Sequence, residues 1–206
     1  MTTLPLFPLN IVSFPDEDVN LHIFEPRYKQ LINECWEENK TFGLSAFIDN
    51  KVMPIGTEMK VIQIASTSPT GEMDIKTKGL RTFKIIDFYK ELPDKLYAGA
   101  KVDFLTLENN ADSQLHQQIK DYLKELFTQL GVAKEIRYNN TLDMAHYIGL
   151  TIQEEYDILS KDNEKDQQLL ILAHLQRLIP VVTRARKIKE KLKMNGHFKN
   201  FDKLDF

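Results

Sequence analysis

The spacing of apolar residues changes near residue 110 of this 206-residue chain, and that change constrains the fold most. Before it, apolar and polar side chains alternate, as at Val19, Leu21 and Ile23, which is the period of a half-buried strand. After it, apolar residues recur every three or four positions, which is typical of packed helices. The sequence therefore predicts an α+β fold, with a strand-rich domain over residues 1–110 and a helical bundle over 111–196.

One early helix is expected inside the strand-rich part. Pro26 suits the first helical position, apolar residues follow at helical spacing as far as Cys35, and the helix should end by Asn39. Strands are expected at residues 42–48, 58–65, 73–78, 80–88 and 97–107. Turns are expected at residues 49–50, 54–56, 68–71, 79 and 93–94. Several short strands with one helix favour a small sheet that is closed or strongly curled.

The helical part contains clear start and stop signals. An apolar stripe from Leu115 to Leu130 predicts a helix that Gly131 ends. A short helix is expected over residues 141–148. Thr151 and Glu154 have the spacing of a capping box, which predicts a further helix to about residue 159.

The last helix should begin near residue 162 and end at Gly196. Apolar residues keep one register from Ile171 to Leu192 across Pro180, which predicts a kink near residues 176–180 rather than a loop. Residues 184–193 contain six basic side chains and one acidic side chain. This charge fits a solvated helix end, while binding of an acidic protein or of nucleic acid are the alternatives.

The sequence lacks the motifs of an enzyme. It has no Gly-Lys dipeptide, so a phosphate-binding G-x-x-x-x-G-K-[S/T] loop is missing, and it has no H-E-x-x-H. The five histidines are scattered, so neither a metal nor another cofactor is expected. The only cysteine, Cys35, lies on the apolar face of its helix, where a buried and inert thiol is expected. A single cysteine, with no signal peptide and no membrane-spanning run, favours the cytoplasm.

Three segments resemble a known family. They are L-P-L-F-P-L at residues 4–9, L-H-I-F-E-P-R-Y at 21–28 and G-L-R-T-F at 79–83. They resemble the N-terminal, substrate-binding (LON) domain of Lon-type ATP-dependent proteases. The resemblance implies a PUA-like small β-barrel followed by helices, here expected as a standalone form without ATPase or protease domains. The motif residues, expected to be structural, are Phe7, Pro8, His22, Phe24, Glu25, Pro26, Arg27, Tyr28, Gly79, Arg81 and Phe83.

The resemblance also implies a function, which is recognition of exposed polypeptide segments in protein quality control. The alternative is nucleic-acid binding by a PUA-like domain, and no membrane partner is expected. Candidate polypeptide-binding residues are expected in loops, where strand alternation does not require them: Met53, Phe88, Tyr89 and Leu92. The tail over residues 197–206 has three Phe and one Leu, which predicts docking on its own bundle or on a second copy in a homo-oligomer.

Overall fold

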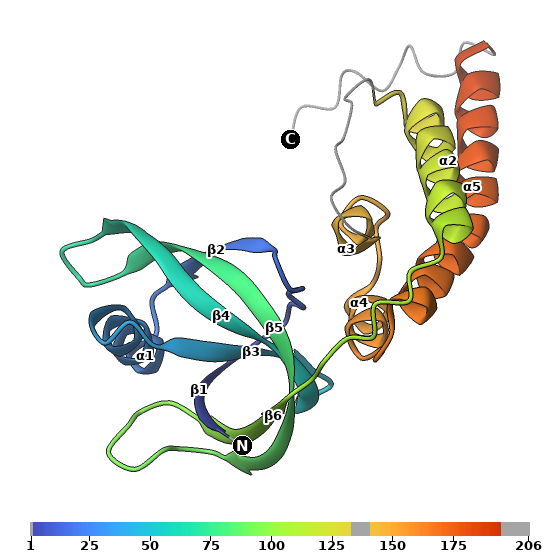
Figure 1. The fold of residues 1–206 in the computed structure, drawn as a ribbon. Coiled ribbons are helices and arrows are strands. Elements are labelled where there is room, and N and C mark those ends of the chain that lie inside the picture. The colour runs from blue at the N-terminus through green and yellow to red at the C-terminus, as the bar shows by residue number, and fades with distance from the viewer. Residues whose placement is uncertain (1, 133–140, 195–206) are drawn as a thin grey trace. The chain divides into compact units, whose positions relative to one another are not determined.

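The computed structural model describes residues 2–132 and 141–194, and it shows the mixed α+β fold expected from the sequence (Figure 1). The chain forms two compact units. The first contains residues 1–109 and 150–163, and the second contains residues 110–149 and 164–206. The expected helix end at Gly196 and the aromatic tail lie outside the described residues.

The first unit is built on one six-stranded sheet. Its strands are β1 (Thr2–Leu9), β2 (Asp18–Ile23), β3 (Thr41–Ile48), β4 (Lys51–Thr67), β5 (Met73–Tyr89) and β6 (Gly99–Phe104). The strand order is β2-β5-β4-β3-β1-β6, and β6 also pairs with β5, so the sheet curls into a partial ring (Figure 1). The β1–β3 pair is parallel, and the other pairs are antiparallel. The expectation of a strongly curled sheet is confirmed.

Two of the expected turns are wrong. Residues 54–56 lie inside β4 and Gly79 lies inside β5. A Cβ at Gly56 would approach the Phe83 ring to 2.6 Å, and a Cβ at Gly79 would overlap the Phe14 carbonyl oxygen. These glycines therefore make room for neighbouring atoms within strands, rather than allowing the chain to turn.

Helix α1 (Pro26–Glu37) covers one face of the sheet and confirms the expected early helix. Its buried residues are Tyr28, Leu31, Ile32 and Cys35, which join sheet residues in the larger core cluster. The Phe7 ring of β1 stacks on the Tyr28 ring with centroids 3.8 Å apart. A second cluster, formed by Leu4, Leu6, Phe83, Ala100 and Val102, fills the other side of these strands.

Helix α4 (Ile152–Leu159) belongs to the first unit, although it lies between helices of the second unit in the sequence. The capping box predicted at Thr151 and Glu154 is confirmed. The Tyr156 hydroxyl accepts a hydrogen bond from the Ile55 backbone N–H at 3.3 Å, which links α4 to β4.

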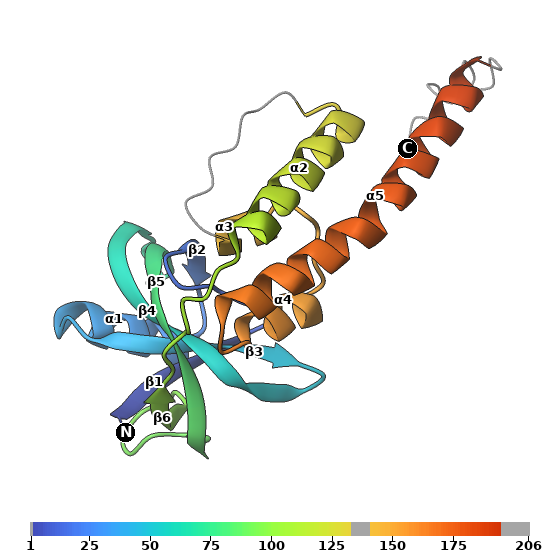
Figure 2. The same cartoon turned by 45° about the vertical axis from the view of Figure 1, so that its right-hand side comes forward.

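The second unit contains α2 (Ser113–Leu130), α3 (Thr141–Ala145) and α5 (Glu164–Met194). Gly131 ends α2 with a left-handed φ of 71°, as predicted. Helices α2 and α5 pack along each other (Figures 1 and 2). Their fully buried side chains include Ile119, Leu123, Leu126, Ile171 and Leu175.

Helix α5 continues through Pro180 without interruption, so the prediction of a helix rather than a loop is confirmed. Its ribbon bends partway along its length (Figure 1). Among the described helices, none has both the length and the apolar character needed to cross a bilayer.

Candidate functional site

The motif residues at the start of α1 make local contacts that fix the junction between β2 and α1. Arg27 pairs with Glu25 at 2.7 Å and lies 4.5 Å over the Tyr28 ring. His22 Nδ1 lies 2.8 Å from Asp74 Oδ1 on the neighbouring strand β5. Hydrogen bonds from Ser66 and from His22 lower the pKa of the Asp74 carboxyl. The Arg27–Glu25 pair is a contact within the motif, and the His22–Asp74 contact joins the motif to strand β5.

The motif segment G-L-R-T-F, residues 79–83, lies in β5, where Arg81 and Phe83 contribute to the packing of the sheet. The Arg81 Nε donates to Glu58 Oε2 at 2.7 Å, and its guanidinium lies 3.4 Å over the Phe104 ring. Glu58 is only 5% exposed and also accepts from Thr41 Oγ1 at 2.7 Å, so this nearly buried carboxylate has two donors. The buried Phe83 ring fills the space left by the absent side chains of Gly43 and Gly56.

The described residues offer no reactive thiol or metal site. Burial, with a smaller contribution from the Glu34 carboxylate, raises the pKa of the Cys35 thiol to about 12. At neutral pH this thiol is protonated, and only a thiolate is a good nucleophile or metal ligand. Within residues 2–132 and 141–194, no group of three or more His, Cys, Asp or Glu side chains could hold a metal ion.

The four residues predicted to contact polypeptides are not all in loops. Met53 lies in β4, half-buried, and its carbonyl accepts from Ser45 Oγ at 2.5 Å. Phe88 and Tyr89 are the last two residues of β5 and are 46% and 40% exposed. Leu92 alone lies in a connection, between β5 and β6. The placement of Met53, Phe88 and Tyr89 in loops is therefore wrong.

The exposure of Phe88 and Tyr89 follows from their cross-strand partners. Phe88 is opposite Ala100, and Tyr89 is opposite Gly99, in the β5–β6 pair. Directly opposite residues share a face of a sheet, so small partners leave the two aromatic rings uncovered. Phe88 therefore faces the side of the sheet on which Ala100 joins the second core cluster, and Tyr89, the next residue in the strand, faces the opposite side. The Leu92 side chain packs over Gly99, with atoms within 2.6 Å of the position that a Cβ of Gly99 would take. It therefore lies on the same face of the sheet as Tyr89.

The connection between β5 and β6 is held against α1 by side-chain contacts. Glu34 accepts from Lys95 Nζ at 2.8 Å and from the Tyr97 hydroxyl at 2.5 Å. Gln30 Oε1 accepts from the Leu96 backbone N–H at 2.9 Å. Burial raises the pKa of Glu34, but the hydrogen bonds from Lys95 and Tyr97 outweigh it and leave the pKa lowered. The Leu96 backbone is thus held against α1, while the Leu96 side chain is 59% exposed.

Exposed apolar residues that sequence patterns did not predict lie where the strand register shifts. Ile62, Leu80 and Ile86 are 54%, 41% and 44% exposed, and each lies at a register shift in β4 or β5. Two adjacent apolar residues in a strand, such as Ile85 and Ile86, are the signal that could have found them, because both cannot face the same core.

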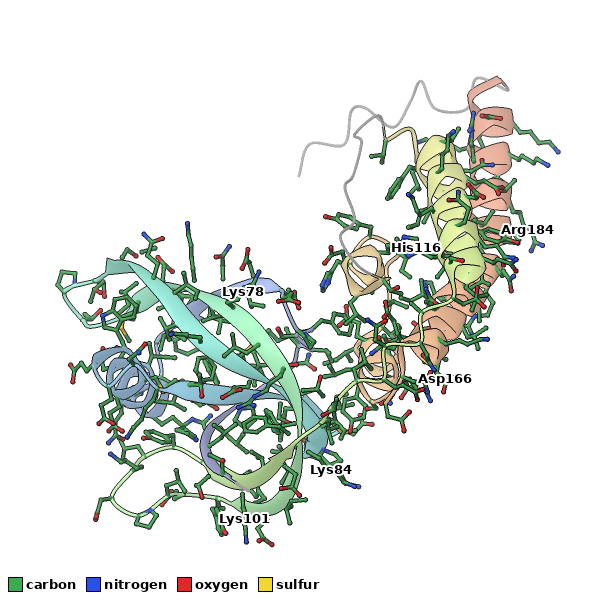
Figure 3. All side chains as sticks on the ribbon, in the orientation of Figure 1. Lys78, Lys84, Lys101, His116, Asp166 and Arg184 are labelled. Carbon is green, nitrogen blue, oxygen red and sulfur yellow. The ribbon has the colours of Figure 1, made fainter. Side chains whose placement is uncertain are left out.

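Two pairs of opposite charge lie across the same β5–β6 hairpin. Lys84 is opposite Asp103, and Asp87 is opposite Lys101. Figure 3 shows Lys84 and Lys101 at separate points along this part of the sheet. Such pairs favour the β5–β6 register, and they leave Ile86, Phe88 and Tyr89 as the exposed apolar side chains in this part of β5.

Comparison with known proteins identifies relatives of this fold. The profile of the family described as the ATP-dependent protease La (LON) substrate-binding domain matches residues 3–178. A Lon N-terminal domain protein from Xanthomonas campestris has a similar structure, with a TM-score of 0.67 and 20% identity, over 84% of this chain and 98% of that one. The N-terminal domain of the Mycobacterium avium complex Lon protease gives a TM-score of 0.52 and 13% identity, over 90% and 98%. No curated protein sequence matches.

Proposed function

Because this chain belongs to the LON substrate-binding domain family, we propose that it binds exposed apolar segments of other polypeptides, as clients or as partners. The family is defined by substrate binding, and its profile covers residues 3–178, which include most of both compact units. The proposed role is recognition of non-native or unstructured segments in protein quality control.

The exposed apolar end of the β5–β6 hairpin supports this proposal best. We define the hairpin surface as the exposed apolar residues on both faces of the hairpin end: Phe88 and Tyr89, on opposite faces of β5, and Leu96 in the connection, which are 46%, 40% and 59% exposed. Aromatic side chains contribute large contact areas with few rotatable bonds, which favours binding. Because Glu34 and Gln30 already hold the connection in place, little additional ordering is needed when a client binds.

We further propose that the chain acts without catalysis and in the cytoplasm. The raised pKa of Cys35, about 12, removes the single thiol as a nucleophile. A single buried cysteine suits a reducing compartment. Neither hydrolysis of ATP nor cleavage of casein above background is expected from the purified protein.

The proposal is tested by titrating the protein into a fluorescently labelled, permanently unfolded polypeptide and measuring anisotropy. Phe88→Ala and Tyr89→Ala should each raise the Kd by about fivefold to tenfold, because each truncates an exposed aromatic contact. Ile62→Ala is the matched control, since Ile62 is 54% exposed but lies on β4 outside the hairpin surface. Its Kd should change less than about twofold.

Two results would contradict the proposal. One is equal loss of affinity in Ile62→Ala and Phe88→Ala, and the other is no binding of the unfolded polypeptide at about 100 μM protein. Repeating the titration at several salt concentrations separates the alternative, because nucleic-acid binding weakens steeply with salt while apolar burial does not.

A further inference from the structure

An exposed apolar stripe runs along the C-terminal half of α5. It consists of Val181, Ala185, Ile188 and Leu192, spaced by four, three and four residues. Val181, Ile188 and Leu192 are 62%, 52% and 40% exposed, and Ala185 is exposed as well. This spacing keeps all four on one narrow face of the helix, the pattern of a coiled-coil seam.

Toward the N-terminal end of α5, the same face of the helix is covered by other residues of this protein. His174 lies seven residues, or two turns, before Val181, and its Nε2 is 2.9 Å from the carbonyl oxygen of Ile148. Ile148 follows α3, which packs on α5. The exposed stripe therefore continues, in the C-terminal half of α5, the face that α3 covers in the N-terminal half.

Basic residues border the stripe on both sides. Helical geometry places Arg184 and Lys191 along one border, seven residues apart, and Lys189 along the other. All three side chains are exposed, and Figure 3 labels Arg184 on α5. In a coiled coil these are the flanking positions whose charges select the partner.

We propose that the exposed stripe of α5 is a docking site for an acidic amphipathic helix of a partner protein. The partner's apolar residues pack along the stripe, and its carboxylates lie opposite Arg184, Lys189 and Lys191. A second copy of α5 does not fit, because Arg184, Lys189 and Lys191 are all positive and would meet positive residues of the other copy in a parallel or an antiparallel pair. This site is independent of the hairpin surface and of the client binding proposed there.

The composition of the stripe favours a helix over other anionic partners. Single-stranded nucleic acid binds through aromatic stacking, and the stripe contains no aromatic residue. Helices that lie in a membrane interface combine Leu with Trp or Phe, whereas the stripe has no aromatic residue and includes the small Ala185. Single-stranded nucleic acid and anionic lipid are therefore included in the test as competing ligands.

The test uses the full chain and labelled synthetic helices of about four heptads, with binding followed by anisotropy. One peptide has Leu at the core heptad positions and Glu at the flanking positions. A second has Lys at the flanking positions, and a third has the first peptide's composition in scrambled order. The Glu-flanked helix should bind about tenfold tighter than either of the others.

Variants of α5 then locate the site. Lys189→Glu with Lys191→Glu should weaken the Glu-flanked helix by about tenfold and make the Lys-flanked helix the better ligand. Lys187→Glu changes the charge away from the stripe, so it should have less than about a twofold effect. Ile188→Gln, at an exposed position, should weaken both helices without unfolding the protein, as circular dichroism would show.

The proposal is overturned if the scrambled peptide binds as well as the Glu-flanked helix, or if Lys187→Glu matches the double variant. It is also overturned if none of the peptides binds. The same titration is made with a single-stranded RNA and with phosphatidylglycerol vesicles. The proposal is also overturned if either binds more tightly than the Glu-flanked helix and loses that binding in the double variant. The site would then be assigned to that partner.

Discussion

At Gly79, the loop after β1 packs closely against strand β5, although the two segments are far apart in the sequence. The Phe14 carbonyl oxygen occupies the space where a side chain would begin. On either side, the Gly79 N–H donates to the Glu17 carbonyl at 2.8 Å, and the Gly79 carbonyl accepts from Asp16 N–H at 3.0 Å. Only a residue without a Cβ allows the loop after β1 to approach β5 this closely.

Gly79→Ala should therefore destabilise the protein by more than about 3 kcal/mol, because either the loop or the strand must move. Gly71→Ala is the control, since Gly71 has a φ of 76° but no heavy atom within 4 Å of the position that a Cβ would take. That change should cost only about 1 kcal/mol, from the left-handed backbone alone. Urea denaturation measures both, and equal losses would show that backbone conformation, not space, explains Gly79.

At the scale of elements, the helices could be predicted from sequence more completely than the strands. Pro26, the Thr151 capping box and Gly131 mark helix ends through local chemistry, and the structure confirms each one. Strand limits depend instead on partners distant in sequence. Nothing near Gly56 reveals that the Phe83 ring will fill its place, so the local pattern predicts a turn at a glycine that lies inside β4.

The candidate site shows the same dependence on distant partners. Phe88 and Tyr89 could be selected as apolar residues that strand alternation does not require, but their place at the end of β5, opposite Ala100 and Gly99, could not be predicted. Leu92 could be selected for the same reason, yet it packs over Gly99. The cross-strand partners of Phe88 and Tyr89 and the packing of Leu92 over Gly99 both depend on residues distant in sequence, which sequence spacing alone does not give.

The contact of the β5–β6 connection with α1 should depend on pH. The pKa of Glu34 in the folded protein is lowered from its ordinary 4.5, so its contribution to stability is fully present above pH 4.5. As pH falls through the lower folded pKa, protonation removes that contribution. Hydrogen exchange of the Leu96 amide should therefore lose protection below about pH 4.5, after correction for intrinsic rates.

Glu34→Gln provides the control for that measurement, because it retains a hydrogen-bond acceptor but does not titrate. Its Leu96 amide should show low protection that no longer changes in this pH range. A pH response equal to that of the natural protein would assign the effect to another carboxylate.

At the scale of the whole molecule, the chain leaves the first unit after residue 109 and returns to it at residue 150. Helical periodicity groups residues 152–159 with the other helices, because it reports only that a helix has an apolar face. It does not report which surface that face contacts. Tyr156, Ile158 and Leu159 are buried in this return segment, and Tyr156 bonds to β4.

The two units should respond separately to a core mutation. Leu126→Ala should destabilise the second unit by about 2–5 kcal/mol, since Leu126 is 1% exposed within α2. The only tryptophan, Trp36, lies in α1 of the first unit, so its fluorescence reports that unit alone. Circular dichroism should show an earlier helical transition, while the Trp36 transition stays in place.

Leu130→Ala, at a position 54% exposed on the same helix, should change either transition little. Equal shifts of the fluorescence and circular dichroism transitions in Leu126→Ala would mean that the units unfold as one cooperative system.

Strand β5 pairs with β2, β4 and β6 along its 17 residues. One residue inserted or deleted within it would invert the orientation of side chains in several ladders at once. Evolution is therefore expected to vary the length of this protein in the hairpin turns on either side of β5, at residues 68–72 and 90–98, and to keep the strand itself at constant length.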